Sequence, residues 1–242
     1  MDSRPSGSPN YMAIMKKEAG TIKLNDQQEA KVDEWRQEHH TKATELAADI
    51  VAAEHTLAEA SMDGTNLENM MKKFDEIAVM RRTLAELKTK CRDLLQTILT
   101  SEQWTQLVTL QKSAMGLNQQ ANMKNMMHAH PMPNYMAIMK KEAGTIKLND
   151  QQEAKVDEWR QEHHTKATEL AADIVAAEHT LAEASMDGTN LENMMKKFDE
   201  IAVMRRTLAE LKTKCRDLLQ NILTSEQWTQ LVTLQKSAMR LN

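Results

Sequence analysis

The feature of this chain that most constrains its fold is a long internal repeat. Residues 9–118 recur as residues 133–242, so that every position has a counterpart 124 residues further on. Only two positions differ, because Thr97 is replaced by Asn221 and Gly116 by Arg240. A unit of this length is the size of a small domain and is too long for a solenoid repeat. One fold must therefore serve both copies.

The repeat also predicts how the chain is organised. Residues 1–8 read as an expression leader, residues 9–118 are copy one, residues 119–132 are a linker, and residues 133–242 are copy two. Natural duplicates drift apart, so near-identity favours an engineered tandem fusion of two protomers, with a very recent duplication as the alternative. A fusion of this kind predicts a single-chain dimer.

Composition and periodicity predict an all-α fold. The chain has only 6 Gly, 4 Pro and 3% aromatic residues, and it is rich in helix-forming residues. Heptad-like apolar seams predict two long helices in each copy, the first from Asn25 to about Ser61 and the second from Asn66 to about Ile98. The short turn at Asp63 and Gly64 makes them antiparallel neighbours. One hairpin leaves half of each seam uncovered, so we expect the two hairpins to pack as a pseudo-twofold four-helix bundle or cradle.

Helix starts are marked by capping residues. Asn25 with Gln28, Thr65 with Glu68, and Thr100 with Gln103 each have the spacing of a capping box. Short amphipathic helices are expected on both sides of the hairpin, the first over residues 9–19 and ended by Gly20, the last ended by Gly116 in copy one.

Several function classes are disfavoured by the sequence. The net charge is −4, with acidic and basic residues interspersed, which is unsuited to nucleic acid. No apolar run is long enough for a membrane span, and no export signal is visible. We found no nucleophile–base arrangement, paired carboxylates or phosphate-binding loop, so we expect neither an enzyme nor an organic cofactor. Cys91 and Cys215 read as buried thiols, with a disulfide between the copies as the alternative.

Two groups of helix residues are candidate metal ligands. His55 and Glu59 stand four residues apart and share one helix face, a spacing suited to zinc, nickel or copper that is also common in solvated pairs. Adjacent histidines point about 100° apart, so one is expected in the seam and one at the surface, unless another helix supplies further ligands. Together with their counterparts, the candidates on helices are His39, His40, His55, Glu59, His163, His164, His179 and Glu183.

A denser group of soft ligands lies in the linker. Thioether and imidazole donors together suit Cu(I), and two histidines separated by one residue suit Cu(II). The alternative is a former protomer terminus retained as a linker. The residues of this group are Met126, Met127, His128, His130 and Met132. Copper is therefore the first expected metal, with zinc or nickel next. Methionines on the helices, such as Met70, are instead expected in the core.

The stretches LNDQQ at residues 24–28 and LTSEQ at residues 99–103, placed around a long hairpin, resemble the paired LTxxQ motifs of the Spy/CpxP family, which includes ZraP and CnrX. The resemblance covers residues 10–115 and 134–239, although Asn25 replaces the Thr of the first motif. It implies periplasmic localisation of the native protomer and an antiparallel dimer of helical hairpins. It also implies either metal binding in stress resistance or sensing, or an ATP-independent chaperone or adaptor acting on unfolded or sensor-protein clients. An engineered bundle scaffold is the third hypothesis.

Overall fold

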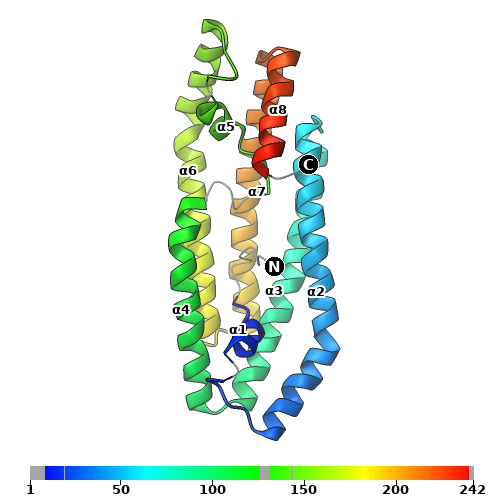
Figure 1. The fold of residues 1–242 in the computed structure, drawn as a ribbon, viewed down its shortest axis with the longest axis vertical. Helices are drawn as coiled ribbons and strands as arrows, with labels where there is room; N and C mark the ends of the chain where they lie inside the picture. Colours follow the sequence, from blue (N-terminus) through cyan, green and yellow to red (C-terminus); the bar gives the residue numbers. More distant parts are fainter. Residues whose placement is uncertain (1–8, 19, 126–130, 143, 240–242) are drawn as a thin grey trace. The chain divides into compact units, whose positions relative to one another are not determined.

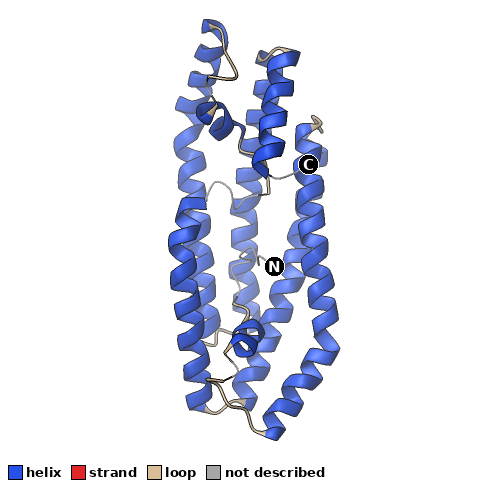
Figure 2. Cartoon of the chain, in the orientation of Figure 1, coloured by secondary structure: helices blue, strands red, loops and turns tan. Residues whose placement is uncertain are grey.

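The fold is entirely helical over the part of the chain that can be described. The computed structural model describes residues 9–18, 20–125, 131–142 and 144–239. Within these ranges every regular element is an α-helix (Figure 2). The helices of copy one are α1 Tyr11–Lys17, α2 Asp26–Met62, α3 Leu67–Ile98 and α4 Ser101–Asn125. Those of copy two are α5 Tyr135–Lys141, α6 Asp150–Met186, α7 Leu191–Ile222 and α8 Ser225–Met239 (Figure 1). The predicted all-α class and the two long antiparallel hairpins are confirmed.

The turn of each hairpin is a Schellman motif. In copy one the amide of Thr65 donates to the carbonyl of Ala60 at 3.0 Å, and the amide of Gly64 donates to that of Ser61 at 3.3 Å. Gly64 has φ +80°, a left-handed conformation that glycine adopts without a steric penalty. Gly188 repeats this geometry in copy two, also with φ +80°. Helix α2 therefore ends at Met62, two residues before the left-handed Gly64.

The caps at both ends of the hairpin form as predicted, but the one at its turn does not. The side-chain oxygen of Asn25 accepts from the amide of Gln28 at 2.9 Å, and Gln28 answers the amide of Asn25 at 3.0 Å. The prediction for Thr65 with Glu68 is wrong. Helix α3 begins one residue later, and Asn66 is its cap, because its side chain accepts from the amide of Asn69 at 2.9 Å. Asparagine is the stronger capping residue, and Thr65 already serves the Schellman turn.

The capping boxes at the starts of α2 and α4 are joined by hydrogen bonds into one structure, which we call the glutamine joint. Thr100 and Gln103 form a second capping box, with bonds of 2.8 and 3.2 Å. The side-chain amide of Gln28 donates to the side-chain oxygen of Gln103 at 2.7 Å and to the backbone carbonyl of Ile98 at 2.8 Å. Gln103 in turn donates to the carbonyl of Lys23 at 2.7 Å. The starts of α2 and α4 are therefore fastened to each other and to the end of α3. Copy two repeats the joint with Gln152 and Gln227.

The flanking helices differ from the prediction. Helix α1 ends at Lys17 and is capped by Glu18, whose φ of −108° and ψ of 30° are not helical, so the helix stops before Gly20. Helix α4 does not end at Gly116 but continues to Asn125, into the predicted linker. A single internal glycine weakens a helix by only about 1 kcal/mol, and the helix-compatible residues that follow continue it.

The copies contribute jointly to each of two compact units. Unit 1 contains the N-terminal part of copy one up to Val51, residues 77–125, and residues 174–202 from the hairpin turn of copy two. Unit 2 contains residues 52–76 of copy one with residues 126–173 and 203–242 of copy two. The copies therefore pack together within the chain, as expected for a single-chain dimer.

Each unit has its own apolar core. The core of unit 1 is built around α1, α3 and α4 and includes Tyr11, Ile22, Leu95 and Leu107, with Met186 supplied by copy two. The core of unit 2 is its counterpart, with Met62 supplied by copy one. Met70 and Met194 are buried, as predicted for adaptable core residues. Among the described residues, no helix is long and apolar enough to cross a membrane.

Candidate functional site

The two predicted histidine–glutamate pairs lie on accessible helix faces. On α2 the Nδ1 atom of His55 lies 3.6 Å from a carboxylate oxygen of Glu59, and about half of each side chain is exposed. On α6 the corresponding distance between His179 and Glu183 is 3.4 Å. Because each pair stands one helical turn apart, both side chains point to the same side of their helix. Each pair can present one imidazole nitrogen and one carboxylate to an ion.

The adjacent histidines are placed differently. His39 stacks on Trp35, with ring centroids 3.8 Å apart and the planes 5° from parallel. Its Nδ1 atom is buried without a hydrogen-bond partner and lies 3.6 Å from a carboxylate oxygen of Glu38. His40 is exposed on the same helix. In copy two, His163 makes the same stack, and His164 is exposed. In each copy, therefore, one histidine is half-buried against a tryptophan of its own helix and its neighbour faces solvent.

Only one residue of the predicted linker cluster lies in the described part of the chain. Met126, Met127, His128 and His130 fall outside the described residues. Met132 is 2% exposed, and its carbonyl accepts a hydrogen bond of 3.2 Å from the ammonium group of Lys212. Among the described residues, the structure holds no group of three or more His, Cys, Asp or Glu side chains that could hold a metal ion.

The contact between the copies forms a second, more elaborate site. We call residues 61–64 and 185–188 at the hairpin turns the tips. The socket of unit 1 consists of Tyr11, Arg92 and Gln96, and it receives the tip of copy two. The socket of unit 2 consists of Tyr135, Arg216 and Gln220, and it receives the tip of copy one. The two sites make matching contacts.

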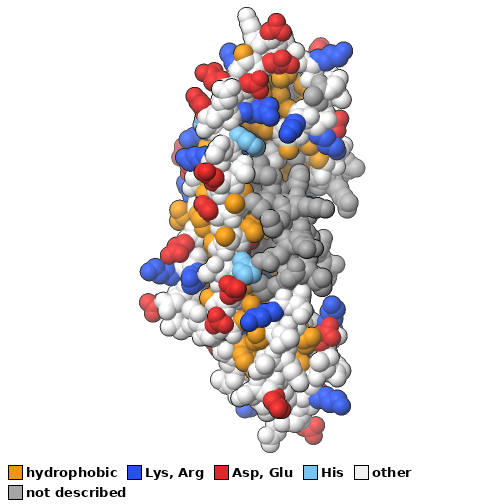
Figure 3. Space-filling view, turned by 90° about the vertical axis from the view of Figure 1, so that its left-hand side faces the viewer, with side chains coloured by type: hydrophobic (Ala, Val, Ile, Leu, Met, Phe, Trp, Pro, Cys, Tyr) orange, Lys and Arg blue, Asp and Glu red, His pale blue; other side chains and the backbone are white. Residues whose placement is uncertain are grey.

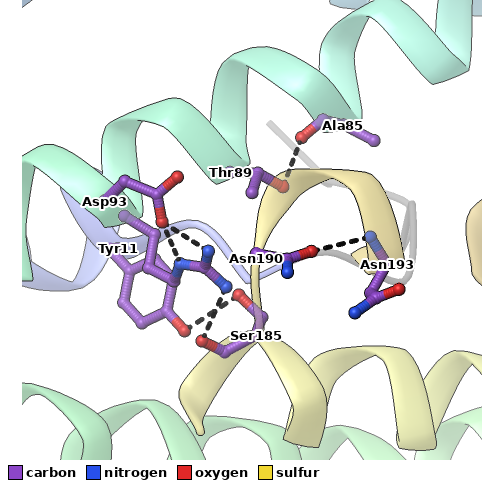
Figure 4. Close-up of polar contacts among 8 residues, drawn as sticks. Tyr11, Ala85, Thr89, Asp93, Ser185, Asn190 and Asn193 are labelled. Atoms are coloured by element: carbon purple, nitrogen blue, oxygen red, sulfur yellow. Dashed lines mark hydrogen bonds and ion pairs between the residues drawn. The ribbon is translucent and has the colours of Figure 1, made fainter. Parts of the chain in front are cut away.

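The tyrosine and arginine of each socket recognise one tip serine. The phenol of Tyr11 hydrogen-bonds the hydroxyl of Ser185 at 3.2 Å, and Arg92 donates to the carbonyl of Ser185 at 3.2 Å (Figure 4). The side chain of Arg92 is fully buried, and its guanidinium is also bound by the carboxylate of Asp93. That carboxylate is 45% exposed, so it neutralises a buried charge while it remains solvated itself.

Close packing completes the site. A Cβ atom at Gly188 would lie 3.1 Å from the amide nitrogen of Gln96, and one at Gly64 would lie 2.9 Å from that of Gln220. The tip glycines are constrained mainly by their left-handed φ, because the glutamine amide against each of them lies at the end of a flexible side chain. In unit 2, the hydroxyl oxygens of Tyr135 and Ser61 lie 3.3 Å apart, and Arg216 donates to the carbonyl of Ser61 at 3.2 Å.

Burial perturbs the titration of groups around the sockets. It raises the pKa of Tyr11 and Tyr135 to about 12, despite the lowering effect of the serine hydrogen bond and the nearby arginine. Burial also raises the pKa of the Cys91 and Cys215 thiols to about 12. Both cysteines are free and buried, in agreement with the first of the two interpretations of the sequence.

Ion pairs also link the two copies. The guanidinium of Arg82 donates to Asp199 of copy two at 2.9 Å and pairs with Glu86 on its own helix. Arg206 repeats this with Asp75 at 2.9 Å. On the face drawn in Figure 3, acidic and basic side chains of the described residues are interspersed. No single sign of charge dominates that face.

One signal for the socket can be read from the sequence. Arg92 shares a heptad stripe on α3 with Ala85, and both are fully buried. Thr89 and Leu95 lie one turn to either side and are buried as well. An arginine in a stripe of small and apolar residues indicates a buried charge with a specific partner. The charge partner, Asp93, is the next residue, whereas the contact with Ser185 was not predictable because that residue lies 93 positions away.

Comparison with known proteins adds no relative. No protein-family model, curated protein or solved structure matches this chain.

Proposed function

We propose that this chain is a non-enzymatic protein that binds borderline transition-metal ions, in the manner of a periplasmic metal-stress or sensor protein built as a tandem of two protomers. The observation that carries the proposal is the accessible pair of His55 and Glu59, which recurs as His179 and Glu183. Each pair offers one nitrogen and one oxygen donor on a rigid helix, the geometry of two adjacent ligands of zinc, nickel or copper.

Two protein ligands leave several coordination positions to water or to further groups. Such a site exchanges its ion readily, which suits sensing or buffering rather than structural stabilisation. The linker residues Met126, Met127, His128, His130 and Met132 add a separate set of softer donors that favours copper. Metal ions displace the proton of a coordinating imidazole, so we expect the affinity for metal to fall in acid.

Calorimetric titration with Cu²⁺, Zn²⁺ and Ni²⁺ tests the proposal. The informative variants are His55→Ala with His179→Ala, and His128→Ala with His130→Ala. Gln37→Ala with Gln161→Ala is the matched control, because both are exposed polar residues on the same two helices and neither is a candidate ligand. We expect the parent chain to bind at least one of these ions with Kd below about 10 µM. The variant with His55→Ala and His179→Ala should bind fewer ions per chain than the parent. If the parent binds none of the three ions this tightly, the proposal is wrong.

A second candidate function is an ATP-independent chaperone or adaptor. The glutamine joint favours it, since the joint gives both LTxxQ-like stretches one shared physical role and so supports the family resemblance. Suppression of aggregation of a chemically denatured client at equimolar chain would support this function. A chain that neither binds metal nor suppresses aggregation would leave the engineered scaffold as the remaining hypothesis.

A further inference from the structure

The tip of each copy is unable to reach the socket of the same copy. Ser61 precedes α3, whereas Arg92 lies 25 residues along that helix from Leu67. At about 1.5 Å per residue this is a separation of about 38 Å along a rigid rod. Recognition of a tip by a socket therefore always takes place between two copies.

Nothing in the contact specifies that both copies belong to one chain. The tips are identical in sequence, and so are the three socket residues. The two positions that differ between the copies, Thr97/Asn221 and Gly116/Arg240, are neither tip nor socket residues. Both sockets also make the same contacts, with tyrosine–serine distances of 3.2 and 3.3 Å and an arginine–carbonyl distance of 3.2 Å in each.

We propose that the socket is a docking site for the tip of a second molecule of this chain, so that two chains exchange tips and form a closed dimer. In that dimer each socket holds the same serine, glycine and backbone carbonyl as in the monomer. A tip of the same chain and a tip of a second chain compete for each socket. The covalent connection between the copies gives the tip of the same chain an effective concentration on the order of 1 mM. Exchange therefore becomes substantial when the chain concentration approaches about 1 mM.

Mass-resolved mixing of the wild-type chain is the first test. Unlabelled and ¹⁵N-labelled chains are mixed at about 1 mM, unfolded by heat, cooled and examined by native mass spectrometry. We expect dimers of mixed isotopic mass, at twice the 27.6 kDa of one chain, and a reduced dimer fraction when the same sample is refolded at micromolar concentration. Thr97→Asn is the control, because it changes neither tip nor socket and should leave the dimer fraction unchanged.

Complementary variants of the full chain provide the second test. Gly64→Val with Gly188→Val disables both tips, since a β-branched residue is strained at φ +80° and would strike the socket glutamine. Arg92→Ala with Arg216→Ala disables both sockets. Mixing the two variants should yield a heterodimer that neither variant forms as a homodimer, because only the mixture pairs intact tips with intact sockets. If either variant fails to fold, the refolding of mixed wild-type chains is the test of the proposal. Monomers only, after refolding of the wild-type mixture at about 1 mM, would overturn the proposal.

Discussion

At the scale of single residues, the buried ionisable groups predict how stability depends on pH. Cys91 and Cys215 have a folded pKa of about 12 against 9.0 for a free thiol. Their pKa is raised in the folded state, so the stability they contribute is present below pH 9 and is lost as the pH rises toward 12. Burial of Lys88 and Lys212 acts in the opposite sense. It lowers their pKa from 10.5 to about 8, so stability from these groups increases between pH 8 and 10.5.

We expect the two effects to be separable by substitution. In the wild-type chain, the free energy of unfolding should fall steeply between pH 10.5 and 12, where only the thiols and the tyrosines Tyr11 and Tyr135 contribute. Replacing Cys91 and Cys215 by Ala should reduce the steepness of this fall, while a smaller fall due to the tyrosines remains. Urea unfolding at pH 7, 9, 10.5 and 11.5 measures the difference. An unchanged alkaline profile in the variant would show that the thiols are not protected by burial.

At the scale of the helices, the glutamine joint should be the most sensitive point of each copy. Gln28→Glu keeps the shape of the side chain but removes the amide donor that binds Ile98 and Gln103. Loss of donors to two partly buried acceptors should lower the free energy of unfolding by about 1–3 kcal/mol. Gln27→Glu is the matched control, since Gln27 is exposed and adjacent in the same helical turn. Thermal unfolding of both variants checks this, and equal effects of the two substitutions would contradict a specific role for the joint.

Helix boundaries show which features can be read from the sequence. Asn25 with Gln28 and Thr100 with Gln103 were identifiable, because a capping box is local. The wrong cap at Thr65 arose where two local motifs compete for one turn. The bond between Gln28 and Gln103 was not predictable, since it joins residues 75 positions apart. The hairpin pairing followed from the apolar seams, whereas the polar contacts of the tips and sockets required the three-dimensional arrangement.

At the scale of the whole molecule, both units depend on segments from both copies. We therefore expect the copies to remain associated when the chain is cut. A protease site placed within residues 126–130 leaves α4 and Met132 intact on either side. After cleavage, the two fragments should migrate as one species in size-exclusion chromatography at micromolar concentration. Two separate folded fragments would contradict the single-chain dimer.

The shared composition of unit 1 also has a consequence for synthesis on the ribosome. Its N-terminal segments are complete at residue 125, but the last segment that it needs ends at residue 202. At about 5–20 residues per second, the 77 residues in between take roughly 4–15 s to translate. During that interval the phenol of Tyr11 lacks its partner Ser185, and the apolar core of unit 1 lacks Met186. We therefore expect the core of unit 1 to stay incomplete on the nascent chain until the hairpin turn of copy two has been translated.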